Sequence, residues 1–151
     1  MTRQPLTLQE VEALARRAHE GQTDKAGRPY AEHLAAVAEG VRLRGGTPAQ
    51  QAAAWLHDAV EDEALTPAEL ASAALPEEVK AMVLALTKRP GEPLEEYAAR
   101  ILATPGAPLV KEADLAHNAD PVRLSVLDAP TRERLTAKYA YVRSLLGVTA
   151  P

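Results

Sequence analysis

Residues 52–62 read AAAWLHDAVED, an apolar run that ends in one imidazole and three carboxylates. Alanine and leucine favour helices, so the run predicts a buried helix. On a helix, Glu61 lies one turn beyond His57, and Asp62 lies one turn beyond Asp58. Clustered carboxylates repel one another and lose hydration energy unless a cation lies among them. The stretch therefore indicates either a cation site or a helix end with a solvated acidic face.

The composition of the whole chain also favours helices. Its 151 residues include no Phe, one Trp and four Tyr, and alanine and leucine make up most of the 46% that are hydrophobic. Aromatic residues and isoleucine, which favour strands, are scarce. A chain of this length suits one domain, and no internal repeat or linker divides it. We therefore predict an all-α fold with a single domain over residues 1–151, and we exclude a sandwich or a barrel.

Start and stop signals divide the chain into about eight helices. Thr7, Thr47 and Thr66 are each followed three residues later by Glu or Gln, which is the pattern of a capping box. The connection at residues 21–30, GQTDKAGRPY, is long and polar, and long ordered loops are often functional. The expected helices cover roughly residues 8–19, 30–44, 48–64, a short segment from 67, 76–88, 94–102, 109–119 and 128–146.

Charge and residue usage exclude several function classes. The chain has 17 Lys+Arg and 21 Asp+Glu, a formal net charge of −4, which argues against nucleic-acid binding through phosphate neutralisation. The absence of cysteine excludes a disulfide framework, a thiol nucleophile, Cys-ligated zinc and iron–sulfur clusters. No apolar stretch approaches the roughly 18 residues of a membrane span, and the first residues, MTRQPLTLQE, lack the apolar region of a signal peptide. We expect a soluble, cytoplasmic domain that binds neither nucleic acid nor membrane.

A second polar cluster in apolar surroundings lies at residues 110–118, VKEADLAHN. It places Asp114 and Asn118 one helical turn apart. His33, early in the second expected helix, supplies another imidazole. Two nitrogen and two oxygen ligands from three helices would form a metal site that suits Mn, Fe or Zn, and the ligand types alone leave the choice open. The predicted ligands are His33, His57, Asp58 and Asp114.

The chain resembles the HD-domain metal-dependent phosphohydrolases, specifically the small single-domain alarmone hydrolases of the RelA/SpoT type. Four stretches carry the resemblance in order between Ala18 and Asp120: AHEGQTDKAGRPYAEH, AAAWLHDAVED, ALTK and VKEADLAHNAD. Each lies at the spacing that this family uses. The resemblance implies an all-α HD-domain bundle whose motif core covers about residues 18–120, and it implies that the synthetase domain of the longer members is absent.

The resemblance also implies roles for particular residues. His33, His57, Asp58 and Asp114 match the ligands of one divalent ion, most often Mn²⁺, with Zn, Fe and Mg as alternatives. Glu61 and Asp62 match the pair of catalytic residues that acts on the attacking water. Tyr30 is expected to pack the loop against the second helix. The remaining histidines, His19 and His117, are expected to be structural.

The expected substrate contacts follow from the same resemblance. Lys25 and Asn118 match positions that contact the bound nucleotide, and Lys111 is a further candidate for a phosphate contact. Asp24 takes the place where long members carry an arginine beside the base. This difference leaves the recognition of guanine open.

The implied reaction is hydrolysis of the 3′-pyrophosphate of the guanosine alarmones of the stringent response, (p)ppGpp, which releases pyrophosphate and GDP or GTP. One alternative is an HD phosphohydrolase that acts on an adenosine alarmone, on the 2′-phosphate of a nicotinamide dinucleotide, or on a deoxynucleotide. The other is a nucleotide-binding module that has lost turnover. The complete set of ligands and carboxylates favours an enzyme. The expected partner in every case is a small phosphorylated nucleotide.

Overall fold

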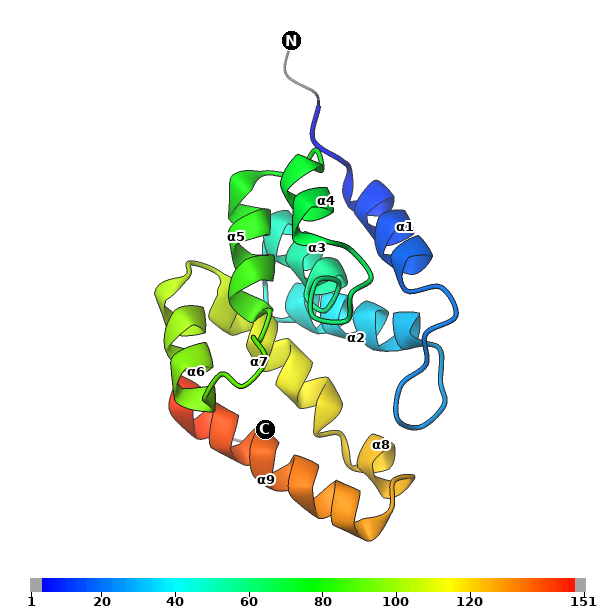
Figure 1. The fold of residues 1–151 in the computed structure, drawn as a ribbon, viewed down its shortest axis with the longest axis vertical. Helices are drawn as coiled ribbons and strands as arrows, with labels where there is room; N and C mark the ends of the chain where they lie inside the picture. Colours follow the sequence, from blue (N-terminus) through cyan, green and yellow to red (C-terminus); the bar gives the residue numbers. More distant parts are fainter. Residues whose placement is uncertain (1–3, 149–151) are drawn as a thin grey trace.

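The computed structural model describes residues 4–148, and this part of the chain contains nine helices and no strand (Figure 1). The all-α prediction is confirmed. The helices are α1 (Leu8–Ala18), α2 (Tyr30–Leu43), α3 (Pro48–Leu56), α4 (Pro67–Ser72), α5 (Glu77–Leu86), α6 (Leu94–Ala103), α7 (Ala107–Asn118), α8 (Pro121–Ser125) and α9 (Ala129–Leu146). None of the helices in the described part is both long and apolar enough to span a membrane.

Helix α3 lies at the centre of the fold and contacts α1, α2, α5 and α7, while α9 runs along α6 and α7 at the opposite end from the N-terminus (Figure 1). The side chains of residues 52–56 in α3 are all buried. Helices α2 and α7 approach closely, because a Cβ at Gly40 would lie only 3.3 Å from the Cβ of Ala113. Small side chains therefore allow α2, α3 and α7 to pack closely, and these are the helices whose polar side chains lie in the core.

The helix starts follow the predicted capping signals. Thr7, Thr47 and Thr66 each form a complete capping box, in which the threonine hydroxyl accepts a hydrogen bond from the amide three residues later. Helix α7 begins differently, after Gly106 at φ 86°. A Cβ at Gly106 would lie 2.9 Å from the Sδ of Met82, so this turn requires glycine for both its backbone conformation and its close approach.

The structure differs most from the prediction at one helix end and at one additional helix. The helix expected over residues 48–64 ends at Leu56, and the chain continues through consecutive turns to Glu63, whose φ is 59°. The short helix α8 was not predicted; its N-cap is Asp120, whose carboxylate accepts hydrogen bonds from the amides of Val122 and Arg123. The sequence Asp-Pro at 120–121 is a start signal of the kind used elsewhere in this chain.

The loop between α1 and α2 is ordered by its own hydrogen bonds. Thr23 and Pro29 form an isolated antiparallel bridge. The Oδ1 of Asp24 accepts from the amides of Ala26 and Arg28, each at 2.9 Å. These bonds hold the loop against the start of α2, where the first polar side chain of the core is found.

Candidate metal centre

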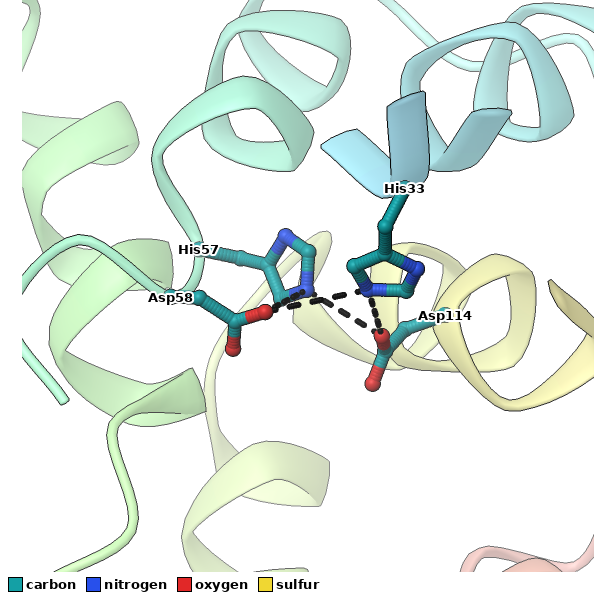
Figure 2. Close-up of side chains that lie close together, drawn as sticks. All are labelled: His33, His57, Asp58 and Asp114. Atoms are coloured by element: carbon teal, nitrogen blue, oxygen red, sulfur yellow. Dashed lines mark hydrogen bonds and ion pairs between the residues drawn. The ribbon is translucent and has the colours of Figure 1, made fainter. Parts of the chain in front are cut away.

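Two imidazoles and two carboxylates meet inside the fold (Figure 2). One ligand atom from each of the four residues lies within 4.8 Å of the others. The Nε2 of His57 is 3.0 Å from Asp58 Oδ2 and 3.1 Å from Asp114 Oδ1. The Nε2 of His33 is 3.0 Å from Asp114 Oδ1 and 3.7 Å from Asp58 Oδ2. The structure thus brings together the four residues that the sequence predicts as metal ligands.

The end of α3 determines how His57 is presented. His57 follows the last residue of α3, and its Nδ1 lies 2.6 Å from the carbonyl oxygen of Ala54, to which it donates. The other ring nitrogen, Nε2, then faces the carboxylates of Asp58 and Asp114. Burial alone would lower the pKa of His57, but these two carboxylates outweigh burial and hold the pKa well above its usual value. The position of Nε2 therefore favours a positive charge, which either a proton or a metal ion can supply.

A hydrogen-bonded chain fixes the proton on His33. Arg123 Nη1, which can only donate, lies 3.1 Å from His117 Nδ1, so this nitrogen is an acceptor. Burial and the charge of Arg123 lower the pKa of His117 to about 4, which keeps its ring neutral. The same Nδ1 lies 2.8 Å from His33 Nδ1, which must then donate. The Nε2 of His33 is left with a lone pair that faces the cluster.

Asp114 is held in its ionised form. Lys111 Nζ donates to its Oδ2 at 2.9 Å, and Asn118 Nδ2 donates to its Oδ1 at 3.1 Å. Burial alone would raise the pKa of Asp114, but the charges of Lys111 and His57 outweigh it and hold this pKa well below its usual range. An ionised carboxylate is the form that ligates a metal ion.

The fourth ligand is supported by a tyrosine. The Tyr30 hydroxyl donates to Asp58 Oδ2, and the ring of Tyr30 stacks on that of His19 at a centroid distance of 5.3 Å. Burial and the charge of Asp58 raise the pKa of Tyr30, so its hydroxyl stays a donor. His19 in turn lies 2.7 Å from the Oε1 of Gln22 through its Nδ1, while its buried Nε2 has no hydrogen-bond partner among the described residues.

The donor set fits a divalent transition metal ion. Two imidazole nitrogens and two carboxylate oxygens converge, His33, His57 and Asp114 are 2–3% exposed, and neighbouring groups set the orientation of each ring. Orientation of ligand imidazoles by a hydrogen bond at the second nitrogen is the usual arrangement around protein-bound metals. A mixed nitrogen and oxygen set of this kind suits Mn, Fe or Zn better than Ca or Mg, which prefer oxygen ligands.

A pocket of about 340 Å³ opens beside the cluster, and the predicted carboxylate pair lines it. The Oε1 of Glu61 accepts from the amide of Lys88 at 2.7 Å, and the Oδ2 of Asp62 accepts from the amide group of Gln22 at 3.0 Å. Burial raises the pKa of both carboxyl groups, and the charge of Asp58 raises both further. Both groups are therefore better suited to exchanging a proton near neutral pH than ordinary carboxylates are.

The predicted substrate contacts line the same pocket. Lys111 and Asn118 both bind the ligand carboxylate of Asp114. Asp24 has its Oδ2 3.1 Å from Arg123 Nη2, and its Oδ1 is engaged by loop amides. Lys25 forms no ion pair or hydrogen bond through its side chain with residues 4–148, which leaves its ammonium group available.

The resemblance to the family pointed to Tyr139 of the last helix as a further residue near the nucleotide, but sequence reasoning missed the other contributions of α8 and α9 to this pocket. Arg123 of α8 and Lys138 of α9 both line it. In α9, Leu135, Tyr139 and Val142 form the apolar stripe of the pocket wall at helical spacing, and Lys138 stands among them. The sequence signal that could have revealed this contribution was a lysine within the apolar stripe of the last helix.

Comparisons with known proteins identify the family and the fold of this chain. Residues 12–94 match the HD domain family, and because the match covers more than half of the chain, the protein belongs to this family. No curated protein matches the sequence. Among solved structures, a metazoan ortholog of SpoT that hydrolyzes ppGpp and plays a role in starvation responses has a similar fold. It shares 21% sequence identity and a TM-score of 0.77, over 97% of this chain and 88% of the other.

Proposed function

We propose that this protein is a metal-dependent phosphohydrolase that removes the 3′-pyrophosphate from guanosine alarmones in the cytoplasm. The observation that carries the proposal is the pairing of a four-residue metal cluster with two carboxyl groups of raised pKa in one pocket. Membership of the HD domain family supports the metal chemistry. The similarity to a solved ppGpp hydrolase supports the choice of substrate.

A divalent ion, for which we propose Mn²⁺, would be held by His33, His57, Asp58 and Asp114. When bound, it would supply charge that polarises the phosphoryl group and lowers the pKa of water. The hydrogen bonds that His57 donates to the carbonyl oxygen of Ala54 and that His33 donates to His117 keep the imidazoles in the orientation and tautomer that this requires.

The carboxylate pair would move the proton. Glu61 or Asp62 accepts a proton from the attacking water and returns it to the departing 3′-oxygen, so that pyrophosphate and a nucleoside diphosphate or triphosphate leave. The amide of Lys88 and the side chain of Gln22 hold these two carboxyl groups at the pocket wall. Both carboxyl groups have a raised pKa, so near neutral pH the free-energy difference between their protonated and ionised forms is smaller than for a solvated carboxylate.

Basic side chains would bind the phosphates. Lys25 has no acidic partner among the described residues and lines the pocket, so its ammonium group can pair with a phosphoryl oxygen. Lys111 and Asn118 contribute indirectly through Asp114 as well as by lining the pocket.

Product identification tests the proposal. Purified protein with added Mn²⁺ is incubated with guanosine 3′,5′-bis(diphosphate), an adenosine counterpart, a nicotinamide dinucleotide 2′-phosphate and a deoxynucleoside triphosphate, and the products are separated by chromatography. We expect GDP and pyrophosphate from the first substrate. Turnover of another member of the panel in preference would replace the guanosine assignment. Tight nucleotide binding without turnover would make the protein a binding module.

The variant His57→Ala is the matched control for this assay. It removes one ligand at a buried position, and we expect it to lose metal retention and turnover together. Full turnover by this variant after metal removal would contradict the proposed metal site.

A further inference from the structure

We propose that Arg100 of α6, which does not line the pocket, is a positioning residue that holds the carboxyl group of Glu61 in place through one peptide group. That peptide group joins Thr87 to Lys88 in the loop between α5 and α6. The inference rests on the proposed function and deepens it, because it extends the machinery of the reaction to a residue outside the pocket.

The path from Arg100 to Glu61 is short and continuous. Arg100 Nη2 donates to the carbonyl oxygen of Thr87 at 2.8 Å. On the other side of the same peptide, the amide of Lys88 donates to Glu61 Oε1 at 2.7 Å. A peptide group is planar, so a bond that fixes its carbonyl also fixes the direction of its amide. A cationic donor on the carbonyl polarises the group as well, which strengthens the amide as a donor.

The chain leaves α5 at this peptide, and α6 sets its course. Thr87 has ψ 106°, which is outside the helical range, so the next amide turns away from α5 and serves the pocket instead. The last carbonyl groups of a helix have no partner within the helix. The hydroxyl of Tyr97 donates to the carbonyl of Leu86 at 2.9 Å. Since Arg100 binds the very next carbonyl, two side chains of α6 hold two consecutive carbonyl groups at this helix end.

Arg100 is itself held by a carboxylate. Its Nη1 and Nη2 donate to the two carboxylate oxygens of Glu92, whose side chain is 7% exposed, and such a bidentate pair fixes the plane of the guanidinium. The guanidinium also lies over the ring of Tyr97, 5.6 Å from its centroid. The buried Nε of Arg100 has no hydrogen-bond partner within residues 4–148. Buried donors are rarely left unpaired, so the bonds to Glu92 and Thr87 determine where Arg100 lies.

The alternative is that Arg100 only braces the loop at residues 87–93. The two roles differ in one measurable respect. Loss of a brace affects turnover whatever side chain stands at position 61. Loss of a positioning residue affects turnover only while the carboxyl group of Glu61 is present, because that group is what Arg100 positions.

The test is a double-mutant cycle on the hydrolysis of guanosine 3′,5′-bis(diphosphate) with Mn²⁺, in which Arg100→Met is made in wild-type and in Glu61→Gln protein. In wild-type protein we expect kcat to fall at least about tenfold with KM within twofold, because a small displacement of a reacting group costs this much. In Glu61→Gln protein the further loss should be less than about twofold. Equal losses in both proteins, or no loss in either, would overturn the inference and leave the proposed function intact.

Arg42→Met is the matched control. Arg42 forms the same kind of bidentate pair, with Glu39 on the exposed surface of α2 outside the pocket, and we expect its loss to leave kcat unchanged. A loss equal to that of Arg100→Met would overturn the inference. If Arg100→Met does not fold, Glu92→Gln replaces it, because it removes the charge that fixes Arg100, and its effect on kcat should depend on Glu61 in the same way.

Hydrogen exchange at the amide of Lys88, followed by NMR, separates the two proposals. We expect this amide to exchange about tenfold faster in Arg100→Met than in wild-type protein, the size expected for loss of one hydrogen bond. If wild-type protein does not hydrolyse the nucleotide but the amide shows this change, the positioning stands and the proposed reaction fails. Unchanged exchange in a folded Arg100→Met protein would overturn the positioning, whatever the turnover.

Discussion

Replacing His117 with phenylalanine should weaken the binding of a divalent ion about 10- to 100-fold, although His117 is not one of the four ligands. The ring nitrogen Nδ1 of His117 accepts the proton of His33 Nδ1 across 2.8 Å, and the two rings stack at a centroid distance of 5.0 Å. Phenylalanine keeps an aromatic ring at this position but has no acceptor. The substitution therefore removes the group that fixes the proton of His33 and leaves the packing in place.

The magnitude follows from the burial of His33, which is 2% exposed. Without His117 the proton of His33 moves to Nε2, where Asp114 Oδ1 accepts it at 3.0 Å. A metal ion can then bind only if the proton returns to Nδ1, where it is buried without a partner. An unsatisfied buried donor costs about 1–3 kcal/mol, which corresponds to about a 5- to 150-fold loss of affinity. Loss of an outer hydrogen bond to a metal ligand commonly weakens metal affinity by about 10- to 100-fold.

The assay is a calorimetric titration of Mn²⁺ into chelator-treated protein, with circular dichroism to show that each variant is folded. His117→Asn is the control, because its side-chain oxygen can accept the same proton, and it should bind metal more tightly than the phenylalanine variant. A folded His117→Phe protein that binds Mn²⁺ within twofold of wild type would refute the reasoning about His33.

Three further changes test other parts of the account. The double variant Glu61→Gln, Asp62→Asn should bind metal normally but lose at least about 100-fold in kcat, the usual size of acid–base catalysis; a kcat within threefold of wild type would remove the pair from the mechanism. Since burial raises the pKa of both carboxyl groups and a base must be ionised, activity should rise with pH through a limb that lies above the ordinary pKa of the base, which is 4.5 for Glu61 and 3.8 for Asp62; a limb below pH 3.8 would contradict this. Gly106→Ala should lower the unfolding temperature more than Gly91→Ala, because both have positive φ but only the first meets Met82; equal shifts in thermal melts would contradict the packing argument.

Local signals predicted most of the fold. Threonine caps and the alanine- and leucine-rich segments gave the helix starts, because capping and helical periodicity act over a few residues. The end of α3 was predicted too late, since the turns after Leu56 keep helix-like spacing and even the bond from the amide of Asp62 to the carbonyl of Asp58, at 2.9 Å. Helix α8 was missed because five residues give little periodicity.

The residues whose side-chain type marks them as metal ligands could be predicted from the sequence. The residues that act through contacts with distant parts of the chain were predicted less well. The ligand types and their helical context predicted the cluster of His33, His57, Asp58 and Asp114 that the structure contains. The contact of His117 with His33 joins residues 84 positions apart, so no local pattern reveals it. The same is true of Asp24 and Arg123, which are 99 positions apart.

The central claim is that one divalent ion in this cluster drives the release of pyrophosphate. The most direct test is a titration of chelator-treated protein with Mn²⁺, in which bound metal and pyrophosphate release from guanosine 3′,5′-bis(diphosphate) are measured in the same samples. We predict that release rises in proportion to bound metal and reaches its maximum at about one ion per chain, the number that a single four-ligand site holds. Full release before any metal is bound, or no release at full occupancy, would contradict it.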